Sequence, residues 1–316
     1  MADKDTGRTR LLIDAARLHY EHGMTHQEIA AELGLSRIKV TRLLAQARAT
    51  GVVEIRINAP EEPFADLADR LRERYRLNMV WIAPTLPDTA RATAALDQMG
   101  AEAIGRTLDA GSLVGVSLSS TLGRAIEQVA PREDLASRQI GFVPMAGSWG
   151  GWQQGVNPGE LAQRLARRVG GRAYSFPAPL LAPSPAFAAT LTAFPEVSDA
   201  LELARAADTL LFGLGGLDWT TSQLQDSLTD HEKRQLVERG AVGDIGARFF
   251  DAQGRQVASD VDRRVIGLTL DDMSHAAQRL VLAAGKSKLK ALRVALSIGS
   301  ATALCTDSAT ARGLLD

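Results

Sequence analysis

The sequence predicts an α/β protein with a small N-terminal (winged) helix-turn-helix domain and a larger domain built on a Rossmann-like, mainly parallel sheet. Residues 25–46 fit two short helices joined by a tight turn, and after residue 64 short apolar runs alternate with helical segments. The stretch APEEPF at Ala59–Phe64 has the prolines and acids of a linker. We therefore expect domains at residues 1–58 and 59–316.

The first helix of the motif carries its own start and stop signals. Thr25 and Glu28 have the spacing of a capping box, in which each side chain accepts a hydrogen bond from the other residue's backbone N–H. Ile29 and Leu33 form its inward stripe. Gly34 follows where the chain must leave the helix, in a positive-φ conformation that costs glycine little.

The second helix begins after Ser36, a capping residue, and its apolar residues Val40, Leu43, Leu44 and Ala47 repeat with helical spacing. Its outward side chains suit a DNA major groove, because Arg and Lys bind guanine edges or phosphates and Ile can touch a thymine methyl. The alternative is an ordinary helical hairpin with a solvated basic face. We predict DNA contacts from Gln27, Ser36, Arg37, Ile38, Lys39, Thr41 and Arg42.

Flanking segments complete the predicted N-terminal domain. A helix over Arg10–His22 would place Leu11, Ala15 and Leu18 against the motif. The alternating residues VVEIRIN, 52–58, predict a half-buried strand that could form part of a wing. The net charge of −1 hides a local basic cluster in residues 36–58, which fits a short DNA site better than unspecific coating of nucleic acid.

Composition excludes several other classes of protein. No apolar run is long enough to cross a bilayer and the start MADKDTGRTR does not resemble a signal peptide, so we expect a cytoplasmic protein without membrane contact. Cys305 is the only cysteine, which excludes an internal disulfide and a thiolate metal cluster; its apolar neighbours indicate an inert core thiol. We expect no metal and no cofactor.

The larger domain alternates strand-like and helical segments. The strand-like runs are MVWIA, LVGVSLS, IGFVPMAG, AYSFPAP, TLLFGLGG, RVIGLTL, RLVLAAG and ATALCT, and ELAQRLARRVGG and SKLKALRVAL are typical helices between them. This pattern predicts a mainly parallel sheet covered on both faces, with ligands beyond the carboxyl ends of its strands. Residues Gly243–Val257 instead predict an inserted hairpin with Gln253-Gly254 near its turn.

Polar residues follow several of these runs. Ser119 and Ser120 precede a helical segment that opens at Thr121, where free N–H groups could bind a phosphate or polyol; helix capping is the equal alternative. Lys288 begins another helix, where a cation suggests an anionic ligand and a solvated basic turn is the alternative. The glycines of GLGG lack the spacing of a dinucleotide fingerprint, so we do not expect NAD. Weaker candidates for hydroxyl and phosphate contacts are Asp244, Asp262 and Arg264.

These motifs, in this order, resemble the SorC/DeoR-type bacterial transcriptional regulators. The N-terminal part of the resemblance is THQEIAAELGLSRIKVTRLLAQARATGVVEIRI. The rest is GVSLSSTL, FVPMAG followed by Asn157, LLFGLGGLD, AVGDIGARFFDAQG, RRVIGLTL, AAGKSKLKAL and TDSATARGLL. The resemblance implies that the larger domain has the fold of sugar-phosphate isomerases and glucosamine-phosphate deaminases, used for sensing. It also implies tetramers, arranged as dimers of dimers, on operator DNA.

The resemblance further implies an effector site for a phosphorylated sugar or polyol. Leu118 and Ser119 stand where the family usually has tryptophan and glycine, and Ser148 follows Gly147 where the family usually has a second glycine. These departures indicate a reshaped pocket, suited for example to an unphosphorylated polyol. The implied effector-binding residues are Ser117, Ser119, Ser120, Thr121, Gly147, Asn157, Asp244 and Lys288.

We therefore expect a homo-oligomeric transcriptional regulator, a repressor of a carbohydrate or polyol catabolic operon, controlled by a sugar, polyol or sugar phosphate. One alternative is a sugar-phosphate isomerase or deaminase, but Asp244 is the only candidate base at a strand end, so we do not expect an enzyme. Another alternative is an interaction protein whose larger domain only oligomerises.

Overall fold

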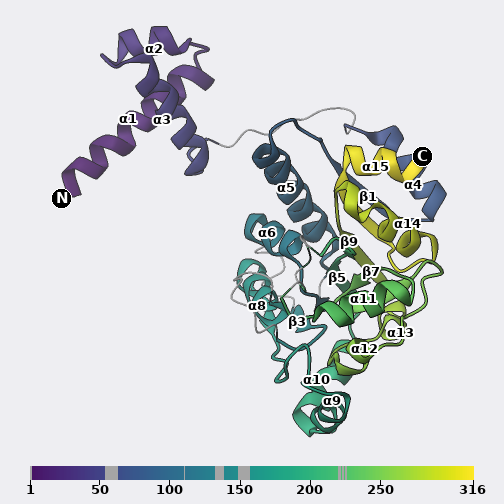
Figure 1. The fold of residues 1–316 in the computed structure, drawn as a ribbon. Coiled ribbons are helices and arrows are strands. Elements are labelled where there is room, and N and C mark those ends of the chain that lie inside the picture. Colours follow the sequence, from purple (N-terminus) through teal and green to yellow (C-terminus); the bar gives the residue numbers. More distant parts are fainter. Residues whose placement is uncertain are drawn as a thin grey trace. The chain divides into compact units, whose positions relative to one another are not determined.

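The computed structural model describes residues 2–53, 63–109, 111–131, 139–148, 157–219, 222, 224 and 226–316. The chain divides into two compact units, Met1–Glu62 and Pro63–Asp316 (Figure 1). The predicted boundary at residues 58 and 59 lies outside the described residues.

The described part of the N-terminal unit is a three-helix module of α1 (Ala2–Tyr20), α2 (His26–Glu32) and α3 (Arg37–Ala49). The bounds predicted for this helix were wrong, because α1 begins at Ala2 and ends at Tyr20. Its predicted inward face is confirmed, since Ala15 is buried and Leu11 and Leu18 pack, partly buried, against the core. The predicted strand at 52–58 lies mainly outside the described residues. The buried core consists of Leu12, Ala15, Ala16, Ile29, Ala30, Val40, Leu43, Leu44 and Ala47.

The larger unit is built on a seven-stranded sheet in the order β1-β10-β9-β5-β2-β3-β4, in which every described strand pair is parallel. The predicted parallel sheet is therefore confirmed. Its strands are β1 (Met79–Ala83), β2 (Leu113–Val116), β3 (Gly141–Pro144), β4 (Arg172–Ala173), β5 (Thr209–Gly213), β9 (Gln278–Leu282) and β10 (Ala303–Asp307).

Helices cover both faces of this sheet, as Figure 1 shows. On one face, α5 (Thr89–Thr107), α6 (Ser120–Gln128) and α8 (Pro158–Val169) bury a core with Leu211 and Cys305. On the other face, α4 (Ala65–Tyr75), α10 (Pro195–Arg205), α14 (Leu289–Ser297) and α15 (Ser308–Leu315) bury a core with Leu210 and Phe212. Neighbouring residues of β5 thus enter opposite cores, which explains why the strands read as continuous apolar runs.

Two predicted strands are largely absent from the described sheet. In AYSFPAP only Ala173 belongs to a strand, because Pro177 and Pro179 have no N–H to donate to a ladder. RVIGLTL forms single bridges at Val265 and Gly267 and no strand. This segment instead joins two loops, since Ile266 N–H donates to Leu180 and Leu268 N–H donates to Met145.

A small antiparallel sheet lies beyond the end of β5. It contains β6 (Gly215–Gly216), β7 (Ala241–Ile245) and β8 (Arg248–Asp251). The predicted hairpin is confirmed, but its turn is Gly246-Ala247, where both residues have positive φ as a two-residue hairpin turn requires. Gln253-Gly254 forms a second turn after β8, closed by the Phe250–Gln256 bridge.

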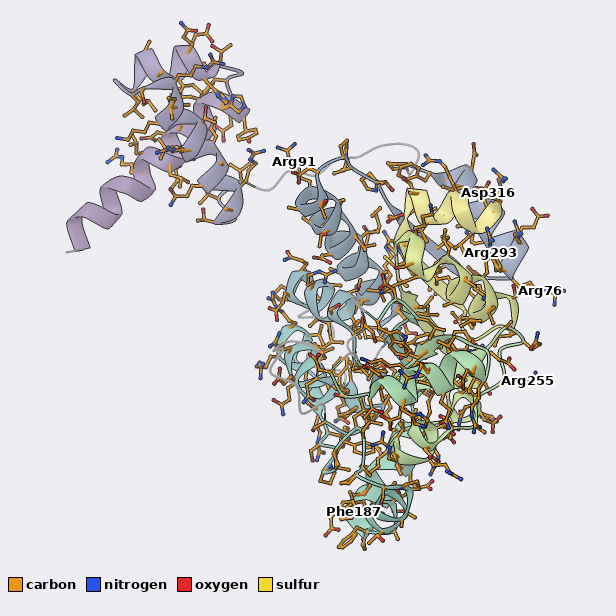
Figure 2. All side chains as sticks on the ribbon, in the orientation of Figure 1. Arg76, Arg91, Phe187, Arg255, Arg293 and Asp316 are labelled. Carbon is orange, nitrogen blue, oxygen red and sulfur yellow. The ribbon has the colours of Figure 1, made fainter. Side chains whose placement is uncertain are left out.

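The remaining helices are short: α9 (Pro185–Thr192), α11 (Asp230–Glu238), α12 (Asp260–Arg264), α13 (Leu270–Ser274) and the 3-10 turn η1 (Lys286–Lys288). Figure 2 labels Phe187, which α9 exposes to solvent. No helix among the described residues is long and apolar enough to cross a membrane. Burial raises the pKa of the Cys305 thiol to about 12, in agreement with the predicted inert core thiol.

Candidate DNA-reading surface and effector pocket

The turn between α2 and α3 is fixed by local hydrogen bonds. Thr25 Oγ1 accepts from Glu28 N–H (3.3 Å), and Glu28 Oε2 accepts from Thr25 N–H (2.8 Å), so the predicted capping box is confirmed. The bond from Thr25 N–H also holds the pKa of Glu28 below its usual value. Gly34 has φ +62° and open space around a hypothetical Cβ, so glycine is required there for conformation and not for packing.

Helix α3 is capped by Ser36, whose Oγ accepts from Lys39 N–H (3.2 Å). Val40 and Leu44 are buried against the other two helices, whereas Ile38 is 68% exposed. Most of the Ile38 side chain therefore lies outside the core and is accessible to a partner. The structure exposes all seven residues predicted to contact DNA: Gln27, Ser36, Arg37, Ile38, Lys39, Thr41 and Arg42.

The exposed face of α3 is electropositive. Arg37, Lys39 and Arg42 form no ion pair with any acid in the described ranges, and α3 itself contains no acidic residue. Their charges are therefore available to an anionic partner. The arrangement can bind phosphates through the cations and base edges through the side chains between them.

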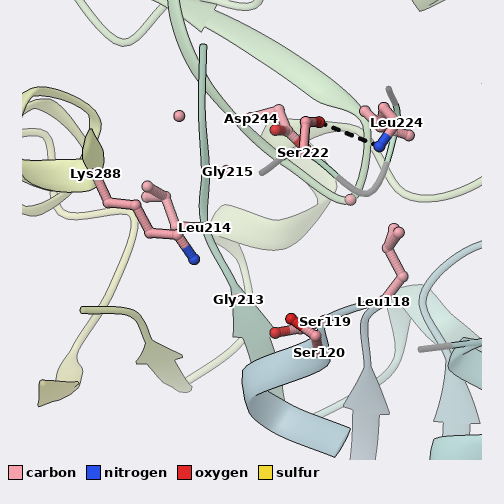
Figure 3. Close-up of a pocket in the computed structure, with 12 residues that line it drawn as sticks. Leu118, Ser119, Ser120, Gly213, Leu214, Gly215, Ser222, Leu224, Asp244 and Lys288 are labelled. Atoms are coloured by element: carbon pink, nitrogen blue, oxygen red, sulfur yellow. Dashed lines mark hydrogen bonds between the residues drawn. The ribbon is translucent and has the colours of Figure 1, made fainter. Parts of the chain in front are cut away.

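The larger unit has a pocket where strands of its sheet end (Figure 3). The pocket is a partly open cleft whose cavity volume is about 60 Å³. It combines hydroxyl groups, one carboxyl group and one ammonium group with three leucines. The lining residues are Leu118, Ser119, Ser120, Gly213, Leu214, Gly215, Gly216, Ser222, Leu224, Asp244, Gly246 and Lys288.

Glycines at the end of β5 let the surrounding side chains approach closely. A Cβ on Gly213 would collide with the side chain of Ser119, and a Cβ on Gly215 would collide with the carboxylate of Asp244. A Cβ on Gly216 would lie 2.6 Å from the carbonyl oxygen of Ser287. The glycines of GLGG, whose spacing does not fit a dinucleotide fingerprint, therefore allow three other chain segments to pack closely around the pocket.

Asp244 is the acidic group of the pocket. It pairs with Gly215 across the small sheet, and its Oδ2 accepts from Ala247 N–H (3.1 Å) in the hairpin turn. Burial raises the pKa of Asp244 to about 6, although the Ala247 hydrogen bond and the positive charge of Lys288 oppose the shift. The remaining carboxyl oxygen can accept hydrogen bonds from hydroxyl groups of a ligand.

Lys288 is the basic group of the pocket, and Figure 3 shows it extending toward the chain segment from Gly213 to Gly215, where β5 ends and β6 begins. It is partly buried, and loss of solvation lowers its pKa while Asp244 opposes that shift. Arg124 of α6 lowers the pKa of Lys288 further and is itself paired with the buried Asp97 (3.1 Å). The ammonium group of Lys288 therefore has both a carboxyl group and a second cation near it.

The predicted effector residues fall into two groups. Ser119, Ser120, Asp244 and Lys288 line the same pocket. Ser119 also caps α6, since its Oγ accepts from Leu122 N–H (3.2 Å), so the capping role that we considered is present together with a place in the pocket.

The other four predicted effector residues are not among those that line the pocket. Ser117 and Thr121 are buried beside it. Gly147 packs against the backbone of residues 178 and 179, where a Cβ would collide. Asn157 caps α8 by accepting from Gly159 N–H (3.1 Å). A binding role for these four stays a prediction.

Asp262 and Arg264, the weaker candidates for ligand contacts, form ion pairs with other residues of the protein. Asp262 accepts from the buried Arg248 (3.0 Å), which also donates to four backbone carbonyls between residues 262 and 268. Arg264 pairs with Glu232. Sequence reasoning missed Leu214, Ser222 and Leu224 as lining residues. Leu214 lies within the GLGG sequence but has no polar group to mark it, and Ser222 and Leu224 lie outside the quoted motifs.

Comparison with known proteins identifies the family. Residues 60–316 match the protein family described as "Putative sugar-binding domain", and residues 17–50 match "Sigma-70, region 4". The first match spans most of the chain. The chain belongs to the SorC/DeoR family of sugar-binding transcriptional regulators. The predicted helix-turn-helix and α/β sensing domain are those of this family.

Individual SorC/DeoR family members match nearly end to end. The deoxyribonucleoside regulator of Bacillus subtilis (strain 168) is 29% identical over 314 residues, covering 99% of both chains. The erythritol catabolism regulatory protein EryD of Brucella abortus (strain 2308) is 29% identical over 320 residues, covering 100% of this chain and 98% of EryD. The crystal structure of the full-length sorbitol operon regulator SorC from Klebsiella pneumoniae has a TM-score of 0.79 and 25% identity, over 98% and 99% of the two chains. These relatives are named as regulators, which confirms the expectation of a regulator over an enzyme.

Proposed function

We propose that this protein represses a carbohydrate or polyol catabolic operon and that a small ligand in the pocket of the larger unit controls its binding to operator DNA. The observation that carries the proposal is the presence, in one chain, of an exposed basic recognition helix and a separate pocket with both hydroxyl-binding and anion-binding groups. Because DNA is the target, we infer that the protein acts in the cytoplasm.

The effector in this proposal is a sugar, a polyol or a sugar phosphate. The carboxyl group of Asp244 accepts ligand hydroxyls, and the ammonium group of Lys288 faces any anionic group. Ser119 and Ser120 lie at the N-terminus of α6, where backbone N–H groups and the helix dipole favour a phosphate. Ser117, Thr121, Gly147 and Asn157 would act from around the pocket. Leu118, Leu214 and Leu224 would contact the carbon skeleton.

We further propose that the active form is a homodimer or a tetramer formed from two dimers. A single helix-turn-helix reads a short half-site, and two copies joined by symmetry provide the affinity and spacing for a full operator. Ligand binding would change how well the paired units fit both half-sites.

Fluorescence anisotropy on the DNA upstream of the protein's own gene tests this function. The full chain is titrated onto that DNA and onto random DNA, with and without a panel of sugars, polyols and their phosphates. We expect tight, salt-sensitive binding to the upstream DNA that one class of compound weakens. Equal binding to both DNAs, unchanged by every compound, would contradict the proposal. Lys288→Met should remove the response to phosphorylated compounds and leave DNA binding without ligand unchanged.

A further inference from the structure

Three of the chain's five histidines lie close together in sequence, at positions 19, 22 and 26 of the N-terminal unit. His19 is near the end of α1, and His26 is the first residue of α2. Their rings meet edge to face, with centroids 5.1 Å apart. The described residues contain no group of three or more His, Cys, Asp or Glu side chains that could hold a metal ion, so the cluster requires a different explanation.

His26 is hydrogen-bonded to the recognition helix. Its Nδ1 lies 3.0 Å from Oγ1 of Thr41, which is fifteen residues away in sequence. Thr41 Oγ1 also lies 3.1 Å from the carbonyl oxygen of Arg37. A carbonyl oxygen can only accept, so the single hydroxyl proton of Thr41 goes to Arg37. The Thr41 oxygen must then accept from His26, whose Nδ1 carries the proton.

His19 holds this arrangement from the other side. Its Nδ1 lies 2.9 Å from the carbonyl oxygen of Met24, so this nitrogen also carries a proton, and its ring is fixed by the chain segment between α1 and α2. The ring of His26 is therefore held between the ring of His19 and the hydroxyl of Thr41. The hydroxyl group of Thr41 thus has two hydrogen-bond partners within the protein before any DNA is present, and one of its acceptor positions remains for a ligand.

We propose that His26 is a positioning residue for DNA reading, which fixes the side chain of Thr41 in one orientation on the exposed face of α3. This inference rests on the proposed function, because it assumes that α3 reads DNA. A side chain that is already ordered loses less conformational entropy on binding, and it presents its methyl and hydroxyl groups in one geometry. His26 thus acts on sequence discrimination at one base position and not on the general attraction to phosphate.

The test measures the affinity of the full chain for its operator and for random DNA, in the variants His26→Ala, His26→Asn, Thr41→Val and the double variant His26→Ala/Thr41→Val. We expect His26→Ala to weaken operator binding by about threefold to tenfold and to leave random-DNA binding and the salt dependence unchanged. His26→Asn should restore most of the affinity, because its amide N–H can replace the Nδ1 donor. The double variant should be no weaker than the weaker single variant.

Three outcomes would overturn the inference. If His26→Ala weakens binding equally on operator and random DNA, His26 binds phosphate. If the effects of His26→Ala and Thr41→Val add in the double variant, His26 does not act through Thr41. If His26→Asn binds the operator as weakly as His26→Ala, the hydrogen-bond donor of residue 26 has no effect. Exposed His22 provides the matched control, since the hydrogen-bond partners of Thr41 are His26 and Arg37 and His22→Ala removes neither. If His26→Ala unfolds the N-terminal unit, the near-isosteric Thr41→Val removes the same hydrogen bond. Failure of the parent protein to distinguish operator from random DNA would instead refute the proposed function.

Discussion

The carboxylate of Asp244 occupies the space that a side chain on Gly215 would need. The two residues are paired across the small sheet, with Gly215 on β6 and Asp244 on β7. The acidic group therefore reaches the pocket over a bare backbone, on the side where Lys288 also lies. This relationship links a glycine of the GLGG sequence directly to the ligand chemistry of the larger unit.

Replacing Gly215 with alanine should displace Asp244 and damage the pocket. Because the new methyl group would overlap the carboxylate, we expect a loss of about 1–3 kcal/mol in the free energy of unfolding and at least tenfold weaker effector binding. Denaturant unfolding and ligand titration measure the two effects. Gly159→Ala is the control, since a Cβ there lies 3.5 Å from its nearest neighbour, an ordinary contact. Effector affinity unchanged in Gly215→Ala would show that Asp244 does not need its present position.

Stability should depend on pH through Asp244. Its pKa of about 6 in the folded protein is above the ordinary value of 3.8, so between these pH values the folded state keeps a proton that the unfolded state has lost. The contribution of Asp244 to the free energy of unfolding therefore decreases as pH rises from about 4 to 6, and it stays constant above pH 6. Relative to Asp244→Asn, the parent should lose about 1–3 kcal/mol of unfolding free energy across this window. A difference between the two proteins that does not change from pH 4 to pH 7 would contradict the assignment.

Arg248 should be essential for the stability of the larger unit. Its side chain is 7% exposed and donates to Asp262 and to four backbone carbonyls, so Arg248→Met would leave several buried acceptors unpaired. We expect a loss of about 3–5 kcal/mol in the free energy of unfolding. Arg255→Met is the control, because its ion pair with Asp251 has an arginine side chain that is 75% exposed, and such pairs contribute at most about 1 kcal/mol. If urea unfolding shows that Arg248→Met and Arg255→Met lower the free energy of unfolding equally, this prediction is wrong.

Arg42 on the exposed face of α3 should contribute to operator recognition. If it reads a base, Arg42→Ala should weaken operator binding by about 1–3 kcal/mol and relax sequence preference at one position. If it binds only phosphate, affinity should fall to a similar degree on every DNA and the salt dependence should become shallower. Anisotropy titrations at several salt concentrations separate these cases, with Lys290→Ala in the larger unit as the control. Operator affinity equal to that of the parent would exclude Arg42 from the interface.

Local interactions made the N-terminal unit predictable. Thr25 and Glu28 form their capping box within four residues, Gly34 ends α2 through its own conformation, and Ser36 caps the next helix. The error in α1 concerned its bounds, since the helix begins at Ala2, before the apolar residues that pack against α3. The strands of the larger sheet were also predictable, because each is buried on both faces and therefore reads as a continuous apolar run.

The pocket could be predicted only in part. Ser119, Asp244 and Lys288 were recognised by their places in ordered motifs and by their polar groups. Leu118 and Leu214 lie in the same motifs without a polar group, and Ser222 and Leu224 lie outside them. Asp262 and Arg264 were considered as ligand partners, but Arg248 and Glu232 bind them instead. Partners of this kind depend on contacts between segments distant in sequence.

The sequence by itself determined the helix-turn-helix, the parallel sheet, the family and the exposed basic face of α3, because caps, turn glycines and apolar periodicity act between residues a few positions apart. Only the tertiary structure decided that Gly215 makes room for Asp244, that Arg248 binds the segment from residue 262 to 268, and that His26 is hydrogen-bonded to Thr41. These relationships arise from side chains brought together by packing, whose geometry no local pattern encodes.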